Sequence, residues 1–444
     1  MISKSPQCRP RRVVITGMGT VSPLGSTLDE LWEALVSSQS GVGPLTVPSR
    51  NPLPVKFAAQ ASQFTGKIDC FGPLENDQKK AIRKGLKVMC RECQMGVAVA
   101  QLALNHAGIA PGAVDPTRSG IDFGVDYMLS APEEFIEGTQ RSVDEQGQFD
   151  SRRWPEHGIT QMSPLWLLKY LPNMPASHVA IYNDFRGPNN SITLREAAAN
   201  MAVGEAFRII TEGRADRMLV GATGTRLHAM KMIHCIQQAE LAFPEASPAQ
   251  ASRPFDRDRT GMVLGEGAGA ILLEELASAR ARGAKIYGEI AGAASSSAIG
   301  PNMTALPRQA ITNVLSGVLA DAGIAAEQIG HIHAHGLSTK TSDQEEAQAI
   351  AGVFGSRATA VPVVAAKGHF GNLGAGSGMV ELITSVLAIQ HDILFPVLNY
   401  ETHDATCPIN VVSDNQTPSG ESFINLSMTS QGQASALLVG RYRE

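Results

Sequence analysis

Short apolar runs alternate with longer amphipathic segments at the start of the chain. An apolar run at 13–15 leads into a glycine-rich stretch at 16–20 and an amphipathic segment at 29–36. Apolar positions at helical spacing fill 86–107, and Gly108 follows as a helix stop. The pattern predicts a strand, a glycine turn and a helix, and then a long helix that ends near 107.

The same alternation continues to the end of the chain. The predicted helices cover 196–212, 305–322, 344–353 and 379–391. The predicted strands cover 217–221, 268–275, 285–291, 329–333 and 361–366, with a late strand that begins at 425–428 and continues at 436–439. Residues 120–180 lack this regularity and are expected to form an insertion or cap. Strands that alternate with helices predict an α/β fold with parallel or mixed sheets.

Composition narrows the class of protein. The chain has 444 residues, of which 43% are hydrophobic and 18% are charged, which excludes intrinsic disorder and suits a large packed core. The net charge of −5 shows no overall excess of basic residues, so the composition does not indicate a nucleic-acid-binding protein. Six scattered cysteines are not a disulfide framework. No run of 18 apolar residues predicts a membrane span, so we expect a cytoplasmic protein.

Several familiar motifs are incomplete. The glycine loop at 374–378 lacks the last glycine of a dinucleotide fingerprint, and neither a P-loop nor a G-x-S-x-G elbow is present. Cys90 and Cys93 form a C-x-x-C pair inside a helical pattern, which favours buried helix cysteines over a zinc site. His331, His333 and His335 share one face of a strand end, which leaves a metal site as an alternative interpretation.

Seven segments together resemble the β-ketoacyl-ACP synthase family, the elongating condensing enzymes of fatty-acid and polyketide synthesis. They are RRVVITGMGTVSPLG (11–25), GPNNSI (187–192), GEAFRIITEGRADRMLVGAT (204–223), SRPFDRDRTGMVLGEGAGAILLEE (252–275), RGAKIYGEI (282–290), HAHGLST (333–339) and LGAGSGMVELITSVLAI (373–389). The resemblance implies the thiolase fold, with two similar halves, 1–255 and 256–444, in a five-layer αβαβα body. It also implies a dimer whose substrates are bound to the phosphopantetheine arm of acyl carrier protein, and it implies no further cofactor.

The resemblance places Glu196 where the family has its nucleophilic cysteine. The position lies eight residues after Pro188 and eight before Gly204, so both counts agree without a gap. A thiolate at a helix N-terminus is the family's acyl carrier. A glutamate there would form a mixed anhydride that water hydrolyses, so ordinary condensation by this chain is not expected. Glu196 also has a purely structural interpretation, as a carboxylate stabilised at a helix N-terminus.

The other site residues are also carried over from the family. His335 matches the first histidine and Lys367 the supporting lysine, while Asp343 and Glu346 match its acidic positions. Counting back from Glu381 puts Asn372 at the second histidine, and His369 offers an alternative register. The predicted substrate-binding residues are Ser338, Thr339 and, in the altered late loop at 428–432, Gly432.

Three functions remain open from the sequence. The first is a non-condensing partner similar to the chain-length factors, which pair with a cysteine-bearing ketosynthase. The second is a malonyl-ACP decarboxylase in which His335 and Asn372 donate to the enolate oxygen. The third is condensation with Glu196 as a base. A binding module without chemistry overlaps the first of these functions.

Overall fold

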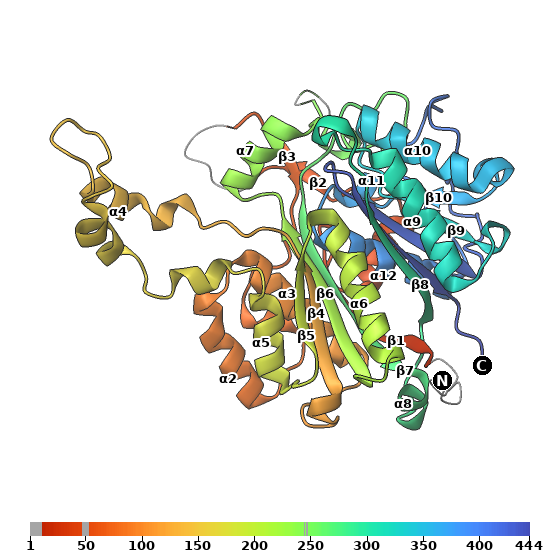
Figure 1. Ribbon diagram of the computed structural model, residues 1–444, viewed down its shortest axis with the longest axis horizontal. Helices are drawn as coiled ribbons and strands as arrows, with labels where there is room; N and C mark the ends of the chain where they lie inside the picture. The colour runs from red at the N-terminus through yellow and green to blue at the C-terminus, as the bar shows by residue number, and fades with distance from the viewer. Residues whose placement is uncertain (1–10, 47–52, 244, 246) are drawn as a thin grey trace, which may run out of the picture.

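The computed structural model describes residues 11–46, 53–243, 245 and 247–444 (Figure 1). Within these residues, 11 strands share one hydrogen-bonded sheet, whose two halves meet where β1 and β8 pair over only three residues each. One half contains, in spatial order, β1 (Val13–Val21), β7 (Glu266–Glu275), β6 (Arg217–Thr225), β4 (Ser119–Val125) and β5 (Asn189–Thr193). The other contains β8 (Gly288–Ser297), β13 (Gln433–Gly440), β12 (Ser422–Met428), β9 (His331–His333), β10 (Pro362–Val364) and β11 (Asn410–Val411).

Both half-sheets mix parallel and antiparallel neighbours, as the sequence predicted. β4 runs parallel to β5 and β6, and β9 runs parallel to β10 and β12. β7 runs antiparallel to β1 and β6, and β13 runs antiparallel to β8 and β12. β7 therefore belongs to the first half-sheet although it follows residue 255. The division of the chain at residue 255 stays a prediction.

Helices form three layers around the two half-sheets. α3 (Arg91–His106) and α5 (Met174–Asn183) cover the outer face of the first half-sheet, and α9 (Pro307–Ala322) covers that of the second, with α10 (Lys340–Phe354) packed on α9. α6 (Ala198–Thr211) and α12 (Gly376–His391) contact strands of both half-sheets and each other. The order helix, sheet, helix, sheet, helix gives five layers. The largest apolar cluster surrounds the two central helices.

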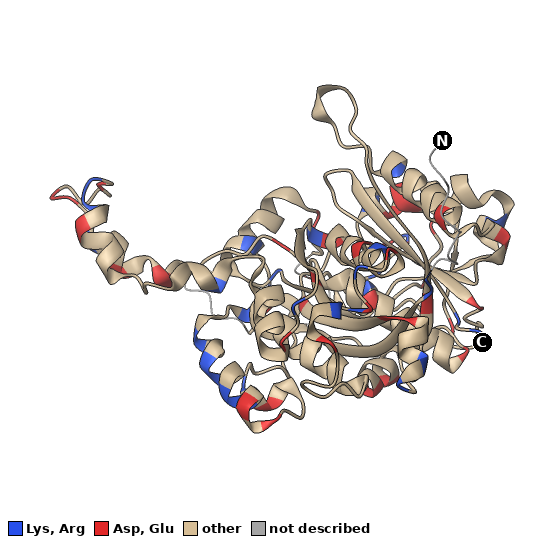
Figure 2. Ribbon diagram, turned by 60° about the horizontal axis from the view of Figure 1, so that its bottom comes forward, with Lys and Arg blue, Asp and Glu red and all other residues tan. Residues whose placement is uncertain are grey.

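Shorter elements complete the described chain. The helices are α1 (Leu28–Val36), α2 (Asn76–Gly85), α4 (Ile136–Arg141), α7 (Ala229–Gln238), α8 (Leu276–Ala281) and α11 (Lys367–Phe370). β2 (Val42–Pro44) and β3 (Phe57–Ala59) form a separate two-stranded sheet. In Figure 2 acidic and basic residues are interspersed along most elements. Within the described residues, no helix has the length and apolarity that a bilayer span requires.

The expectation of a glycine turn at 16–20 was wrong. β1 continues through these residues to Val21. A Cβ atom on Gly17 would lie 2.5 Å from the carbonyl oxygen of Ala103, and one on Gly19 would lie 2.5 Å from that of Val99. The glycines therefore let α3 pack directly on the strand, which is a close-approach role rather than a turn.

The expected cap at 120–180 was only partly correct. Its first residues form β4, a fully buried strand between β5 and β6, and its last residues form most of α5. The segment between them, 126–173, contains α4 and short helical turns and projects from the body on the left of Figure 1. We call it the arm. β4 was missed because its apolar residues alternate with glycine and Asp122.

The late strand is also different from the expectation. Residues 422–440 form two antiparallel strands, β12 and β13, that pair along their whole length. The segment at 428–432, which the resemblance matches to the family's late loop, is the turn of this hairpin. Gly432 has a left-handed backbone there (φ 79°), and a Cβ atom would lie 2.6 Å from the carbonyl oxygen of Ala298. The position therefore requires glycine for packing.

Candidate functional site

Glu196 lies where β5 leads into the first central helix. A single 3-10 turn, Arg195–Ala197, precedes α6, and Arg195 has a left-handed backbone (φ 51°). Only 6% of the Glu196 surface is exposed. The start of a helix favours a carboxylate through the helix dipole, but burial of the charge is costly without a cationic partner.

Arg226 supplies that partner. It follows β6 directly, and its guanidinium donates to Oε1 of Glu196. Its Nη1 also lies 2.7 Å from Oδ2 of Asp126, the first residue after β4. All three side chains are buried. Because β4 and β6 are parallel neighbours, their carboxyl ends bring Asp126 and Arg226 to the same edge of the sheet, beside the start of α6.

These charges hold the pKa of Glu196 well below its usual range. Burial alone would raise this pKa, but Arg226, then Arg195 and His335, and the amide of Asn372 together outweigh burial. Nε of Arg195 lies 3.7 Å from Oε2 of Glu196. Glu196 is therefore ionised at neutral pH and belongs to a buried ion-pair network.

Asn372 uses its side chain to hold Glu196. Its Nδ2 donates to Oε1 of Glu196 at 3.1 Å, and its Oδ1 accepts from the backbone N–H of Gly374 at 2.9 Å. His369 lies elsewhere: its two ring nitrogens contact the carbonyl oxygens of Gln39 and Pro396 at 3.0 and 2.9 Å. The structure thus brings Asn372, and not His369, into contact with Glu196.

His335 sits in a loop after β9 and is oriented by Lys367. The ammonium of Lys367 donates to Nδ1 of His335 at 3.2 Å, to the His335 carbonyl at 2.7 Å and to Glu381 at 2.5 Å. Burial, and then the Lys367 charge, lower the pKa of His335 well below its usual range. The ring is therefore neutral. Since Nδ1 accepts from the ammonium, the ring proton lies on Nε2.

Glu346 fixes the backbone of the same loop. Its carboxylate accepts from the N–H groups of His335 and Gly336 at 2.6 and 2.8 Å. Burial raises the pKa of Glu346 to about 8, although these two hydrogen bonds act in the opposite direction. Glu346 touches the backbone rather than the imidazole, so it positions His335.

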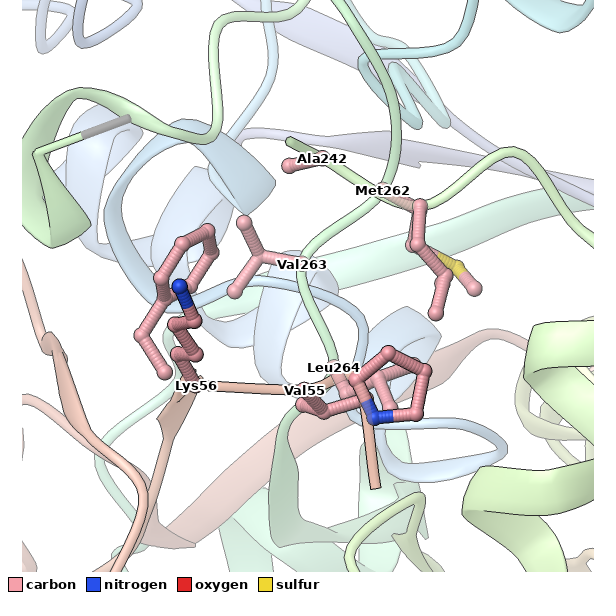
Figure 3. Close-up of a pocket in the computed structure, with 9 residues that line it drawn as sticks. Val55, Lys56, Ala242, Met262, Val263 and Leu264 are labelled. Carbon is pink, nitrogen blue, oxygen red and sulfur yellow. The ribbon is translucent and has the colours of Figure 1, made fainter. Parts of the chain in front are cut away.

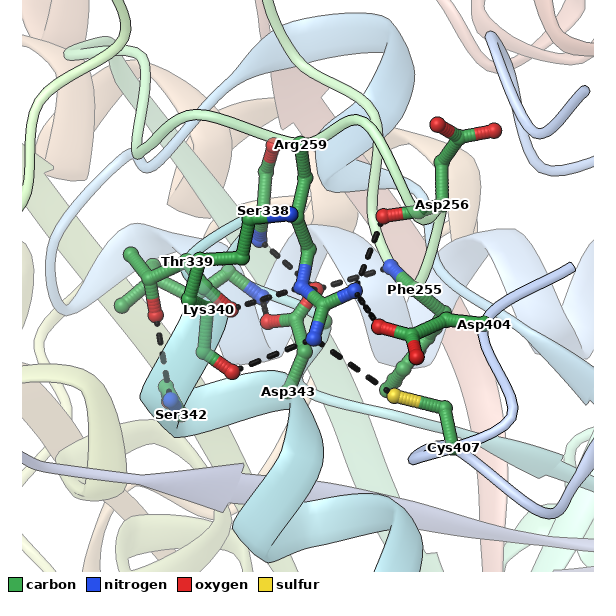
Figure 4. A network of polar contacts seen from close by, with 12 residues as sticks. Phe255, Asp256, Arg259, Ser338, Thr339, Lys340, Ser342, Asp343, Asp404 and Cys407 are labelled. Atoms are coloured by element: carbon green, nitrogen blue, oxygen red, sulfur yellow. Dashed lines mark hydrogen bonds and ion pairs between the residues drawn. The ribbon is translucent and has the colours of Figure 1, made fainter. Parts of the chain in front are cut away.

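A polar network around Arg259 anchors the rest of the loop (Figure 4). The Arg259 guanidinium donates to the carbonyls of Thr339 and Lys340 at 2.9 and 3.1 Å and to Asp404 at 2.6 Å. Asp343 accepts from the N–H groups of 255, 337 and 338. The network places the predicted residues differently: Thr339 caps α10 and faces the cavity described next, whereas the Ser338 hydroxyl is buried and accepts from the backbone of 253.

A cavity of about 220 Å³ opens beside Glu196 and His335. Apolar walls come from Ala239, Met262, Pro307, Leu337 and Met428, and polar walls include Arg195, Gln238, Glu240, Thr339, Thr341, Ser342, Glu345 and Ser430. None of the lining residues is a cysteine, and neither Asn372 nor Gly432 lies among them. On another side of Met262 a pocket of about 20 Å³, between Val55 and Ala242, has room for little more than one water molecule (Figure 3).

The histidine cluster is structural. His331 contacts the carbonyl of Ser419 at 2.7 Å and the hydroxyl of Ser385 at 3.1 Å, and His333 contacts the same hydroxyl at 2.8 Å. The two side chains do share a face, as alternation predicted, but their ring nitrogens already have partners. Among the described residues, no three His, Cys, Asp or Glu side chains gather in an arrangement that would hold a metal ion.

Sequence reasoning missed two members of the site. Arg226 and Asp126 follow different strands and lie 30 and 70 positions from Glu196, so no local spacing connects them to it. Arg226, rather than the sequence neighbour Arg195, makes the direct contact with Glu196. One signal was present: Arg226 is a lone charge at the end of the otherwise apolar and small-residue run 218–227.

Comparison with known protein families identifies the chain. The model of "Beta-ketoacyl synthase, N-terminal domain" matches residues 10–279, and that of "Beta-ketoacyl synthase, C-terminal domain" matches 287–401. A 3-oxoacyl-[acyl-carrier-protein] synthase 2 from Synechocystis sp. is 33% identical over 406 residues, which cover 90% of this chain and 91% of that protein. The chain therefore belongs to the β-ketoacyl synthase family.

Solved structures give the same assignment of the fold. A β-ketoacyl synthase from Burkholderia phymatum aligns with a TM-score of 0.83 and 26% identity, and covers 98% of this chain and 100% of its own. The ishigamide ketosynthase/chain length factor aligns with a TM-score of 0.82 and 26% identity, with the same coverage. The five layers are those of the thiolase fold, as the sequence predicted.

Proposed function

We propose that the chain is a non-condensing partner subunit, similar to a chain-length factor, that pairs with a cysteine-bearing ketosynthase in fatty-acid or polyketide synthesis. One observation carries this proposal. The Glu196 carboxylate, at the position that we assign to the family's nucleophile, is ionised and bound by Arg226 and Asn372. Both contacts go to Oε1, and the ion pair lowers the basicity and nucleophilicity of the carboxylate, which therefore does not replace the thiolate that would accept an acyl chain.

The composition of the cavity supports the same proposal. Its walls contain no cysteine that could replace the missing nucleophile. Its apolar walls suit the hydrocarbon part of an acyl chain carried by acyl carrier protein. The charged side chains of Arg195 and Glu196 also line it. The cavity would then accommodate a chain that is extended in another subunit.

The edge of the sheet offers a surface for that subunit. β5 is the last strand of its half-sheet, and all five of its residues are at least partly exposed. Ile181 on α5, a helix that contacts β5, is 72% exposed, and on the projecting arm Phe149 and Leu165 are each 53% exposed. The free edge of an edge strand, together with exposed apolar side chains on the same molecule, can serve as a pairing surface. We therefore propose a dimer through this edge, with a ketosynthase or with a second copy.

A decarboxylase is the second candidate, because His335 retains a donor. Nδ1 of His335 accepts from Lys367, so the Nε2–H is available at the cavity to an enolate oxygen. Two features count against this function. Asn372 already donates to Glu196 and does not line the cavity, and the Glu196 charge would repel a malonyl carboxylate.

Condensation with Glu196 as a base has the least support. A general base works best when its pKa is near the working pH. The pKa of Glu196 is lowered well below its usual range, so its carboxylate is a weak proton acceptor.

The test combines product analysis with partner capture. Purified protein is incubated with malonyl-ACP, alone and with acyl-ACP, and intact masses of carrier and protein are recorded. We expect malonyl-ACP to stay unchanged and the protein to carry no adduct. Addition of a cysteine-bearing ketosynthase encoded by the same genome should give a stable complex by light scattering and a changed product length.

Each contrary result points to a different function. Acetyl-ACP that disappears with His335→Ala would establish the decarboxylase, and an extended β-ketoacyl-ACP from this chain alone would overturn the proposal. Ile181→Glu tests the pairing surface, because this side chain is exposed and its replacement should leave the fold intact. Complex formation that is unaffected by Ile181→Glu and by Leu165→Glu would exclude this edge of the sheet.

A further inference from the structure

Cys90 and Cys93 form a close thiol pair at the start of α3. Cys90 is the N-cap residue, Cys93 lies in the first helical turn, and their sulfur atoms are 3.6 Å apart. Cys90 is partly exposed, whereas Cys93 is completely buried. The C-x-x-C spacing predicted buried helix cysteines, but the structure gives the two thiols different access to solvent.

Cys90 faces a second cavity, distinct from the one at Glu196. This cavity has a volume of about 510 Å³, and Tyr170, His228 and Glu266 also line it. Cys93 does not line it. A small reagent that enters the cavity therefore meets Cys90 first, with Cys93 directly behind it. This is the arrangement of an attacking thiol and a resolving thiol.

We propose that Cys90 and Cys93 are a redox-active dithiol that closes to an intramolecular disulfide when a small disulfide such as oxidised glutathione enters this cavity. The Cys90 thiolate attacks one glutathione sulfur, which breaks the glutathione disulfide and releases one glutathione thiolate. The Cys93 thiolate then attacks the Cys90 sulfur and releases the second. Two S–H bonds are lost, one S–S bond forms, and two electrons and two protons leave with two molecules of reduced glutathione.

The local backbone allows the sulfur atoms to close. A disulfide requires an S–S distance of about 2.05 Å, so the sulfurs must approach by about 1.5 Å. Cys90 has an extended backbone (φ −70°, ψ 173°) outside the helix, and its N–H donates to the carbonyl of Lys169 at 3.3 Å rather than to a helical partner. The Cys90 carbonyl accepts from the N–H of Gln94 at 3.0 Å, so we expect closure by rotation of the Cys90 side chain, which leaves this first helical hydrogen bond intact.

Two effects set the pH dependence of the reaction. The Cys93 thiol, and then burial, raise the pKa of Cys90 above its ordinary value, whereas the N-terminus of α3 favours a thiolate. Glu92, beside the pair, forms an ion pair with Lys231 at 2.7 Å, and its charge also raises the pKa of Cys90. The initial attack by Cys90 should therefore accelerate as the pH rises from 7 to 9.

The dithiol also contacts both ends of the arm. The Cys93 sulfur lies 3.7 Å from the carbonyl of Lys169, and the Cys90 sulfur lies 3.7 Å from the sulfur of Met128. Oxidation removes the S–H hydrogen that Cys93 can donate to the Lys169 carbonyl. The disulfide should therefore loosen residues 166–170, where the arm returns to the body. This inference is independent of the partner-subunit proposal.

The experiment treats the full-length reduced protein with oxidised glutathione and follows it by intact mass and peptide mapping. We expect the loss of two hydrogens and a peptide in which Cys90 is linked to Cys93. Cys93→Ser should instead trap a stable glutathione adduct on Cys90, because the resolving thiol is absent. Cys90→Ser should give neither product at this pair. Cys70→Ser is the matched control, since Cys70 is also partly exposed and should not affect the linkage.

A second readout tests the connection to the arm. Amide hydrogen exchange of 166–170 should be several-fold faster in the oxidised wild type than in the reduced form, and unchanged by the oxidant in Cys90→Ser. A wild-type protein that accumulates a stable glutathione adduct on Cys90, or that resists oxidation while Cys70 reacts, would overturn the dithiol proposal. Equal exchange in the oxidised and reduced forms would overturn the link to the arm.

Discussion

The Glu196 carboxylate accepts a hydrogen bond from the Arg226 guanidinium, and both side chains are buried. Glu196 comes from the start of a central helix and Arg226 from the end of a strand. Asp126 completes the network from a neighbouring strand. The network thus links elements that are distant in sequence, and its contribution to the free energy of unfolding can be measured.

Removal of the guanidinium should be strongly destabilising. Arg226→Met leaves two buried carboxylates without their cation, and we expect the free energy of unfolding to fall by about 3–5 kcal/mol. Urea denaturation measures this change. The double variant Glu196→Gln, Arg226→Met should lose less than the sum of the single variants, because the two residues interact. A loss below about 1 kcal/mol for Arg226→Met would show that the ion pair contributes little.

The same pair should make stability depend on pH in the acid range. The pKa of Glu196 is lower in the folded protein than its ordinary value of 4.5. Its ion pair therefore contributes fully above pH 4.5 and is lost as the pH falls below that value towards the folded pKa. The stability difference between the wild type and Glu196→Gln should be constant from pH 6 to 7.5 and should shrink below pH 4.5. Urea midpoints across this range measure it, and a constant difference down to pH 3 would contradict the assignment.

A cysteine at position 196 should be an unusually acidic thiol. In Glu196→Cys the thiolate would lie near Arg226 and at the start of α6, and both favour the charged form. The rate of alkylation by iodoacetamide against pH should give a pKa below the free value of about 8.5. The matched control is Glu196→Cys, Arg226→Met, in which burial should raise the pKa instead. Equal profiles for the two variants would show that Arg226 does not act on this position.

Arg259 should control the order of the loop that carries His335. Arg259→Lys keeps the charge but loses the forked set of donors to the carbonyls of Thr339 and Lys340. We expect amide exchange in 335–340 to accelerate several-fold and the free energy of unfolding to fall by about 1–3 kcal/mol. Arg257→Lys is a suitable control, because Arg257 is exposed and, among the residues that the structure describes, its side chain pairs only with Asp258. Unchanged exchange in Arg259→Lys would mean that other contacts hold the loop.

The glycines of β1 give a test of packing. Gly19→Ala places a Cβ atom 2.5 Å from a backbone oxygen of α3, so the helix must shift. We expect a loss of stability of about 1–3 kcal/mol, measured as a lower urea midpoint. Gly43→Ala has open space around its Cβ position and serves as the control. Equal midpoints for both variants would show that the contact relaxes freely.

The sequence predicted best those helices and strands whose apolar residues recur at the regular spacing of one buried face. The central helices and β6, β7 and β9 lie close to their expected bounds, because each presents a regular apolar pattern. β4 was missed because glycines interrupt its pattern, and the glycines of β1 were misassigned because only the position of α3 explains them.

The residues of the candidate site likewise divide into those that the sequence could predict and those that depend on the assembled fold. His335, Lys367 and Glu346 were predicted from family spacing, and the structure brings them together. Arg226 was not, because a salt bridge between segments that are distant in sequence depends on the assembled fold. Likewise, the burial of the Ser338 hydroxyl depends on the backbone at 253, which sequence spacing cannot position.

The two central helices affect how the molecule folds. α6 comes after β5 of the first half-sheet yet also packs on β8 and β13, and α12 comes after β10 of the second half-sheet yet also packs on β6 and β7. Each half of the chain therefore contributes a helix that helps to bury the apolar strands of the other half-sheet. A chain cut between the halves would leave both fragments with a large bare apolar surface, so neither should remain in solution alone. The whole chain should instead unfold in a single cooperative transition, and the ion pair at Glu196 should persist until that transition.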